Sequence, residues 1–345
     1  MKIYNFVFLL CILLNSCHDG FDNVLNGPNR IITQFPIEET IKGKKMEHEI
    51  IGINDIFIVD TLFIAFKASG YNNFFEIYST NNFKFLGSFL PKGRGPNEFL
   101  SVNYNNEYLK TEKGLIFWIS DYTLNKRCCF NLSKSIMSKK TIIDTIFTLP
   151  DEGVYINLND TVRLIKTSVP GNIHFKLQDI KTQKDLTKYE ILKSYIPNYT
   201  PDASLSMGLT KHPHRSLVIG NMLFFNQINF FDFDNQKKFS ISYGQPINIF
   251  KTSKLPDDQL RMYYSAVVLT GRYIYALYQN KSMKQFPYFI PGIEIHVFDE
   301  EGCPIKKIHI PENINYFAVD EQNNYIYGIN AQEEIYQYSM INQAI

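Results

Sequence analysis

Residues 91–99 have the sequence PKGRGPNEF and lie between hydrophobic stretches on both sides. A phosphate-binding P-loop needs glycine, four residues and Gly-Lys-Ser/Thr leading into a helix, and this stretch lacks both that spacing and a helical pattern after it. A dinucleotide-binding fingerprint fails for the same reason. Gly93 and Gly95 allow positive φ angles, and Pro96 fixes the next bend. We therefore expect a sharp structural turn, in which Arg94 is also a candidate for ligand contact.

Short hydrophobic stretches recur along the chain and indicate β-strands. Runs of about five to eight residues rich in Ile, Val, Phe and Tyr alternate with Asn, Asp, Gly and Lys, whereas helical periodicity is scarce. The runs group into similar sets that repeat roughly every 45 to 55 residues, a spacing that suits the four-stranded blades of a propeller. The sets cover residues 62–89, 115–131, 161–179, 222–243, 273–310 and 325–340.

The last set stops one strand short of a complete blade. Residues 31–39 (IITQFPIEE) have an extended pattern and no partner of their own. We expect them to supply the outer strand of the sixth blade and to close the ring, which removes a sheet edge open to aggregation. A two-sheet sandwich is the alternative; it explains the strands but neither their period nor the incomplete final set. The prediction is an all-β, six-bladed β-propeller closed by an N-terminal strand.

Two stretches resemble a known family. Residues 117–130 (FWISDYTLNKRCCF) are similar to the repeat of NHL and TolB-like six-bladed propellers, in which a strand ends in Asp and a basic residue opens the next strand. PKGRGPNEF resembles the Gly-Arg-Gly-Pro-Gly-Glu-Phe hallmark of six-bladed propeller lipoproteins of the Bacteroidetes. Asn97 stands where that family usually has Gly, and Asn is the next best residue at positive φ. The resemblance implies one propeller domain over residues 31–345.

The first residues predict export and a lipid anchor. Lys2 precedes an apolar run at residues 6–14 that is too short to cross a bilayer as a helix, which is typical of a signal peptide. The sequence LNSC at residues 14–17 resembles a bacterial lipobox, which implies cleavage before Cys17, lipid on Cys17 and an outer-membrane place in the cell envelope. An ordinary signal peptide or a retained anchor is the alternative. The expected division is a signal peptide at 1–16, a tether at 17–30 and the propeller at 31–345.

The composition argues against several classes of function. Lys plus Arg number 35 and Asp plus Glu 34, so nothing attracts the chain as a whole to nucleic acid. Cys128, Cys129 and Cys303 match no zinc pattern and are expected to be small buried hydrophobes. The single Trp, 22 Tyr and 28 Phe are expected to pack between blades rather than to bind sugar. We expect no cofactor and no catalytic residue.

Strands of a propeller alternate in direction, so its loops divide between two faces. The connections between blades share one face with the loops that join second to third strands. We assign to that face a mostly basic set of candidates for ligand contact: Arg94, Lys126, Arg127, His212, His214, Arg215, Lys284 and Tyr288. The opposite face receives Asp60, Glu112, Asp160, Asp234 and the acidic residues at 299–301 and 320–321. We expect the basic face to favour an anionic ligand or partner; alternatively, turns simply collect residues that solvate well.

His212 and His214 are spaced as a possible metal pair. Pro213 opposes a regular strand between them, and Lys211 and Arg215 would repel a cation, so a solvated basic loop is the better interpretation. We expect no metal site. The predicted function is a membrane-anchored, non-catalytic binding module for a protein, peptide or glycan. The alternative is a lactonase-like or lyase-like enzyme with a metal in the central channel, which would need Asp, Glu, Asn or His converging from several inner strands.

Overall fold

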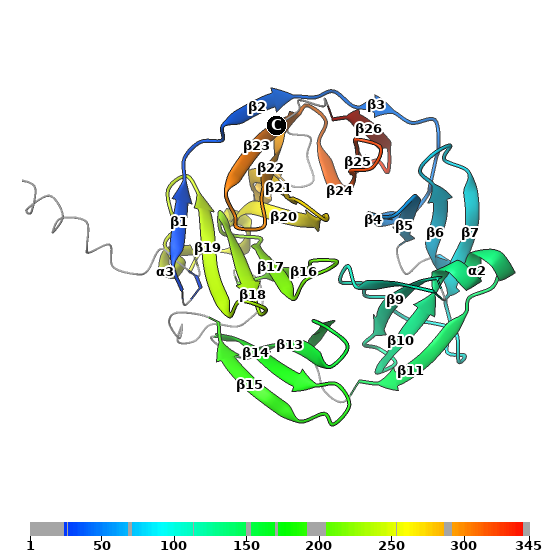
Figure 1. Cartoon of the computed structure of the whole chain (residues 1–345). Coiled ribbons are helices and arrows are strands. Elements are labelled where there is room, and N and C mark those ends of the chain that lie inside the picture. Colours follow the sequence, from blue (N-terminus) through cyan, green and yellow to red (C-terminus); the bar gives the residue numbers. More distant parts are fainter. Residues whose placement is uncertain are drawn as a thin grey trace, which may run out of the picture.

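The structure is a computed structural model that describes residues 24–340 except 26, 68–70, 113, 150–152, 170–171, 192–204, 253 and 286–291. The described residues form six sheets in a ring around a central axis, and each sheet runs from an inner to an outer strand (Figure 1). The fold is therefore the six-bladed β-propeller that the repeating strand sets predict.

Strands that are consecutive in sequence are neighbours in each blade. Blade 1 contains β4 (Ile53–Val59), β5 (Leu62–Lys67), β6 (Asn73–Ser79) and β7 (Phe85–Pro91). Blade 2 contains β8 (Tyr108–Thr111), β9 (Gly114–Asp121), β10 (Lys126–Asn131) and β11 (Ile143–Thr148), with helix α2 (Leu132–Ser138) between the last two strands. Blade 3 contains β12 (Val154–Asn157), β13 (Val162–Val169), β14 (Asn172–Asp179) and β15 (Asp185–Glu190).

The other three blades follow the same order. Blade 4 contains β16 (Met207–Lys211), β17 (Leu217–Met222), β18 (Gln227–Asp232) and β19 (Lys237–Tyr243). Helix α3 (Ile249–Thr252) and the 3-10 turn η1 (Asp257–Gln259) lead to blade 5, which contains β20 (Arg261–Leu269), β21 (Ile274–Ser282), η2 (Met283–Gln285), β22 (Ile293–Phe298) and β23 (Pro304–Ile310). Blade 6 contains β24 (Ile314–Asp320), β25 (Tyr325–Asn330) and β26 (Ile335–Ser339).

The N-terminal segment runs around the outside of blades 4, 5 and 6 (Figure 1). Strand β1 (Asn29–Ile32) pairs in parallel with β19, and β2 (Ile37–Thr40) pairs in parallel with β23. Strand β3 (Lys44–Lys45) pairs antiparallel with β26 and completes blade 6. We call residues 29–45 the strap. Closure by an N-terminal strand is thus confirmed, but the expectation that residues 31–39 close the ring is wrong. Strands β1 and β2 pair with the outer strands of blades 4 and 5, so the strand that closes the ring is β3, which comes later in the chain.

Aromatic side chains fill the space between neighbouring blades. Phe75, Phe89, Phe117 and Phe130 lie between blades 1 and 2 and are almost completely buried. The rings of Phe75 and Phe130 meet edge to face, with their centroids 6.2 Å apart. This geometry adds an aromatic attraction to the burial of large apolar surfaces. The expected role of the aromatic residues in packing between blades is confirmed for this cluster.

The three cysteines of the propeller domain differ in their surroundings. Cys128 is buried in the core between blades 1 and 2, where burial raises the pKa of its thiol to about 12. Cys303 is exposed, so the expectation that all three are buried hydrophobes is wrong for this residue. It follows Gly302 in the turn between β22 and β23, where solvent reaches the side chain.

The turn at residues 91–99 joins the outer strand of blade 1 to blade 2, as its sequence predicts. A Cβ atom at residue 93 would lie 2.0 Å from Oε2 of Glu98, so that side chain would have to move. That carboxylate accepts a hydrogen bond from the backbone N–H of Gly95 at 2.8 Å. The positive φ angles expected at Gly95 and Asn97 are not found. Close approach of the Glu98 side chain therefore favours glycine at residue 93.

No helix among the described residues is long and apolar enough to cross a membrane.

Candidate binding site in the central channel

Two of the basic candidates, Arg94 and Lys126, lie at the turn between blades 1 and 2. The side chain of Lys126 donates a hydrogen bond to the carbonyl oxygen of Glu98, and its Nζ lies 4.0 Å from the centroid of the Phe99 ring. Lys126 therefore anchors the turn. Arg94 is exposed and belongs to the connection between blades, as expected.

Arg127 is buried between blades 2 and 3. Its guanidinium donates to both carboxylate oxygens of Glu107, at 2.9 and 2.7 Å, and to the carbonyl oxygen of Tyr155 at 3.0 Å. Both side chains of the ion pair are 3% exposed. The expectation that Arg127 contacts a ligand is wrong, because this buried pair shields it from solvent.

His212, His214 and Arg215 lie on the face opposite to the connections between blades. They belong to the loop between β16 and β17, the first and second strands of blade 4, so their assignment to the basic face is wrong. Arg215 pairs with Glu300 and, at 3.0 Å, with Asp232. Nδ1 of His212 accepts the N–H of His214 at 3.1 Å, which leaves Nε2 to face Glu300 at 3.1 Å. Burial lowers the pKa of His212. Basic and acidic residues are thus mixed on this face.

The two remaining candidates for ligand contact are on or near the loop between β21 and β22. Lys284 lies in η2 and forms an exposed ion pair with Asp258 at 3.1 Å. Tyr288 lies outside the described residues, as does the predicted lipidation site Cys17. The structure therefore does not assemble the predicted set into one surface.

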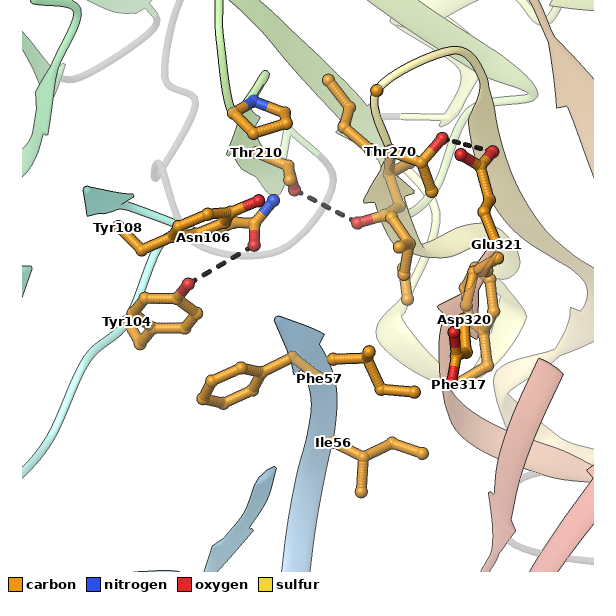
Figure 2. Close-up of a pocket in the computed structure, with 18 of the residues that line it drawn as sticks. Ile56, Phe57, Tyr104, Asn106, Tyr108, Thr210, Thr270, Phe317, Asp320 and Glu321 are labelled. Carbon is orange, nitrogen blue, oxygen red and sulfur yellow. Dashed lines mark hydrogen bonds between the residues drawn. The ribbon is translucent and has the colours of Figure 1, made fainter. Parts of the chain in front are cut away.

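A cavity of about 280 Å³ occupies the central channel instead. It is lined by the inner strands β4, β16, β20 and β24, by Tyr108 of β8 and by residues 104–106 just before that strand. It extends to the loops that follow these inner strands, on the face that carries His214. Figure 2 shows side chains from separate blades turned toward this space. We call it the channel pocket.

One carboxyl group in the channel pocket lacks a basic partner. Asp55 of β4 accepts a hydrogen bond from the N–H of Ile56 at 2.8 Å, and the described residues place no Lys, Arg or His within ion-pair distance of it. The side chain is exposed toward the channel, but the protein atoms around it partly desolvate the charge. This confinement raises the pKa of Asp55 to about 7.

Polar side chains around the channel pocket are held by short networks. Thr270 donates to Oε1 of Glu321 at 2.6 Å, and Thr210 donates to the carbonyl oxygen of Val267 at 3.3 Å (Figure 2). The hydroxyl of Tyr104 lies 3.4 Å from Oδ1 of Asn106. These contacts fix hydrogen-bonding groups at several points of the wall, as a pre-formed ligand site requires.

Aromatic rings supply much of the rest of the wall. Phe57 and Tyr104 are stacked, with their centroids 4.4 Å apart and their planes inclined by 26°. Tyr108 and Phe317 also line the channel pocket. The pocket therefore combines apolar rings with a small number of fixed polar groups.

Comparison with known proteins agrees with this architecture. Residues 54–322 match the family described as TolB-like 6-blade propeller-like. The chain belongs to this family. Among curated proteins, no sequence matches it. One similar solved structure is a protein of Bacteroides fragilis described as exported, with a TM-score of 0.54, 12% identity, and coverage of 89% of this chain and 98% of that one. Another is a DUF4221 family member from Bacteroides vulgatus, with a TM-score of 0.54, 10% identity, and coverage of 92% and 94%.

A metal-dependent enzyme would need several metal-ligating side chains that converge in the channel. The described residues contain no group of three or more His, Cys, Asp or Glu side chains placed to hold a metal ion. In the pair noted in the sequence, His212 accepts the N–H of His214 and faces Glu300. The donors in the described part of the chain do not fit a channel metal.

Sequence reasoning missed the channel pocket because five blades line it and each of them contributes only a few residues. The one local signal is in β4, whose sequence INDIFIV contains Asn54 and Asp55 within an otherwise apolar strand. A carboxylate at an inner-strand position is costly unless it faces water or a ligand.

Proposed function

We propose that the protein is a non-catalytic binding module of the cell envelope, and that it holds part of a protein, peptide or glycan ligand in the channel pocket. The observation that supports this most directly is the pocket itself, a hollow with fixed polar groups, aromatic walls and the carboxyl of Asp55, which has no basic partner among the described residues. Propeller ligands commonly enter at such a central position, where loops from several blades can contribute.

A pull-down from solubilised envelope tests this function. Thr210→Trp would fill the channel pocket from β16, whereas Thr187→Trp makes the same change on the exposed outer strand of blade 3. We expect an envelope component to co-purify with the native protein and with the Thr187 variant, and to be lost with the Thr210 variant. Unchanged capture by Thr210→Trp would contradict binding in the channel.

We also propose that lipid on Cys17 anchors the protein to the outer membrane. The lipobox-like sequence at residues 14–17 supports this anchor. Cys17→Ala should move the protein from the membrane fraction to the soluble fraction without changing its thermal unfolding, since the strap begins downstream at Asn29. Cys303→Ala, which changes an exposed cysteine of the propeller, should remain in the membrane fraction. Membrane association that survives Cys17→Ala would refute the anchor.

A further inference from the structure

The charged side chains around the channel pocket are mostly acidic. Asp55, Asp60, Asp320 and Glu321 line it, and no Lys or Arg among the described residues does so. Within that part of the chain, His214, exposed at the mouth, is the one basic side chain in the lining. Carboxylates gathered around a narrow space focus a negative potential inside it.

Three of these carboxyl groups already have partners. Asp60 forms an exposed ion pair with Lys110 at 2.9 Å. Asp320 accepts hydrogen bonds from the backbone and the side-chain amide of Asn323, at 3.0 and 2.8 Å. Glu321 accepts hydrogen bonds from Thr270 at 2.6 Å and from Tyr275 at 3.3 Å. Asp55 is therefore the carboxyl with capacity left for a ligand.

The rings beside Asp55 favour an organic cation over a bare metal ion. The stacked pair Phe57 and Tyr104, together with Tyr108 and Phe317, offers aromatic surface that attracts an ammonium group and covers its alkyl chain. A metal ion would need several converging donors, which the described residues do not provide. A cavity of about 280 Å³ suits a small amine or a single basic side chain rather than a large ligand.

We infer that the channel pocket binds an alkylammonium group, which pairs with the carboxylate of Asp55 against the aromatic wall. This inference rests on the binding function proposed above and adds the charge of the ligand. It replaces the anionic ligand expected from the basic loops, because the loop at residues 212–215 does not lie with the connections between blades, and His212 and Arg215 are paired with acids. Both a free amine and a lysine side chain carry the required group.

Binding should depend on pH through Asp55. Because the pKa of this carboxyl is raised to about 7, the free pocket holds a proton at acidic pH that an ammonium ligand must displace. Burial raises the pKa of three tyrosines near the pocket, so they stay neutral in this range: Tyr104 and Tyr108 of blade 2 and Tyr316 of blade 6. The other charged or titratable side chains in the described lining of the pocket are Asp60, Asp320, Glu321 and His214. Affinity should rise from about pH 6 to about pH 8 and then level off.

Calorimetric titration of the full-length, detergent-solubilised protein tests the inference. The ammonium probes are 1,5-diaminopentane and N-acetyl-lysine methylamide; the neutral and anionic probes are N-acetyl-norleucine methylamide and N-acetyl-glutamate methylamide. We expect the ammonium probes alone to bind, with affinity increasing between pH 6 and pH 8. Asp55→Asn should weaken them about tenfold or more at pH 8 and flatten the pH dependence. Asp257→Asn, on an exposed turn outside the channel pocket, should change neither property.

The outcomes separate the two proposals. If the neutral or anionic probe binds as well as the ammonium probes and Thr210→Trp blocks it, the binding function holds and the inference of a cationic ligand fails. Absence of binding by both ammonium probes also overturns that inference. If Thr210→Trp leaves the binding of every probe unchanged, the channel site itself is refuted. Among positive results, tighter binding of the diamine indicates a free amine as ligand, and tighter binding of the lysine derivative indicates a polypeptide side chain.

Discussion

At the scale of single residues, the Glu98 side chain leaves little room for a Cβ atom at residue 93, in the turn between blades 1 and 2. The sequence predicts that turn correctly, since Gly and Pro limit backbone conformation locally. It does not show which side chain packs against Gly93, because Glu98 approaches through the folded geometry of the turn. Two glycines with different surroundings provide a direct comparison.

Gly93→Ala should reduce the free energy of unfolding by about 1–3 kcal/mol, because the added Cβ would displace the Glu98 carboxylate from the N–H of Gly95. Gly271→Ala is the matched control, since a Cβ there meets no atom within 4 Å. Urea denaturation of both variants measures the difference. Equal stability of the two would show that the turn adjusts without cost.

Asp55 should make stability depend on pH in the direction opposite to that of a salt-bridged carboxylate. Its folded-state pKa of about 7 is above that of an unfolded Asp, so the folded state holds the extra proton between these values and loses stability as pH rises through them. Asp55→Asn should therefore raise the melting temperature at pH 8 and change it little near the unfolded pKa, at about pH 4. Thermal unfolding at the two pH values measures this, and a stabilisation that is equal at both would contradict the raised pKa.

At the scale of elements, the sequence predicts that strands are present, but it is a weaker guide to the position of each strand within its blade. Consecutive apolar residues mark β17 (LVIGNM) and β18 (QINFFD), but the short inner strand β16, with the sequence MGLTK, has a weak pattern. Without it, the loop at residues 212–215 was assigned to a connection between blades. Omitting one strand reverses the face to which a loop belongs, since neighbouring strands run in opposite directions.

The ion pair between Arg127 of β10 and Glu107 links blade 2 to blade 3, since Glu107 also accepts the N–H of Asn157 at 2.6 Å. Arg127→Met should lower the free energy of unfolding by about 3–5 kcal/mol, because a buried carboxylate loses its partner. Adding Glu107→Gln should restore part of the loss by removing that charge. Lys110→Met, which breaks the exposed pair with Asp60, should cost no more than about 1 kcal/mol. Denaturant titrations would rank the variants, and a loss in Arg127→Met no larger than in the control would contradict the role of the buried pair.

At the scale of the whole molecule, the ring and the channel pocket differ in how far sequence reveals them. The period of the strand sets is sufficient to predict six blades, because each blade is built from consecutive residues. The pocket is assembled from five blades, each adding a few residues separated by long stretches of chain, so no local pattern marks it. The incomplete last set of strands correctly indicates that an N-terminal strand closes the ring. The sequence does not show that the strap also pairs with blades 4 and 5 before it reaches blade 6.

A disulfide across the closing strand should stabilise the entire ring. Lys45 of β3 lies opposite Tyr336 of β26, so Lys45→Cys combined with Tyr336→Cys would join the two ends of the domain. Because the bond would close a long loop, we expect an increase of about 2–4 kcal/mol in the free energy of unfolding under oxidising conditions, lost on reduction. Unfolding with and without dithiothreitol measures it; a correctly formed bond without stabilisation would indicate that closure contributes little.

The strap also imposes an order on biosynthesis. Its residues emerge before every blade strand, yet Asn29 bonds to Ser242, 213 positions later, and Lys45 bonds to Glu334, 289 positions later. Such distant pairings make folding slow and leave sheet edges open while the nascent chain is incomplete. A polypeptide cut short before β26 would thus leave β3 without its partner and the last blade incomplete, while β1 and β2 would still find β19 and β23. Quality control would meet that unpaired edge in the truncated chain.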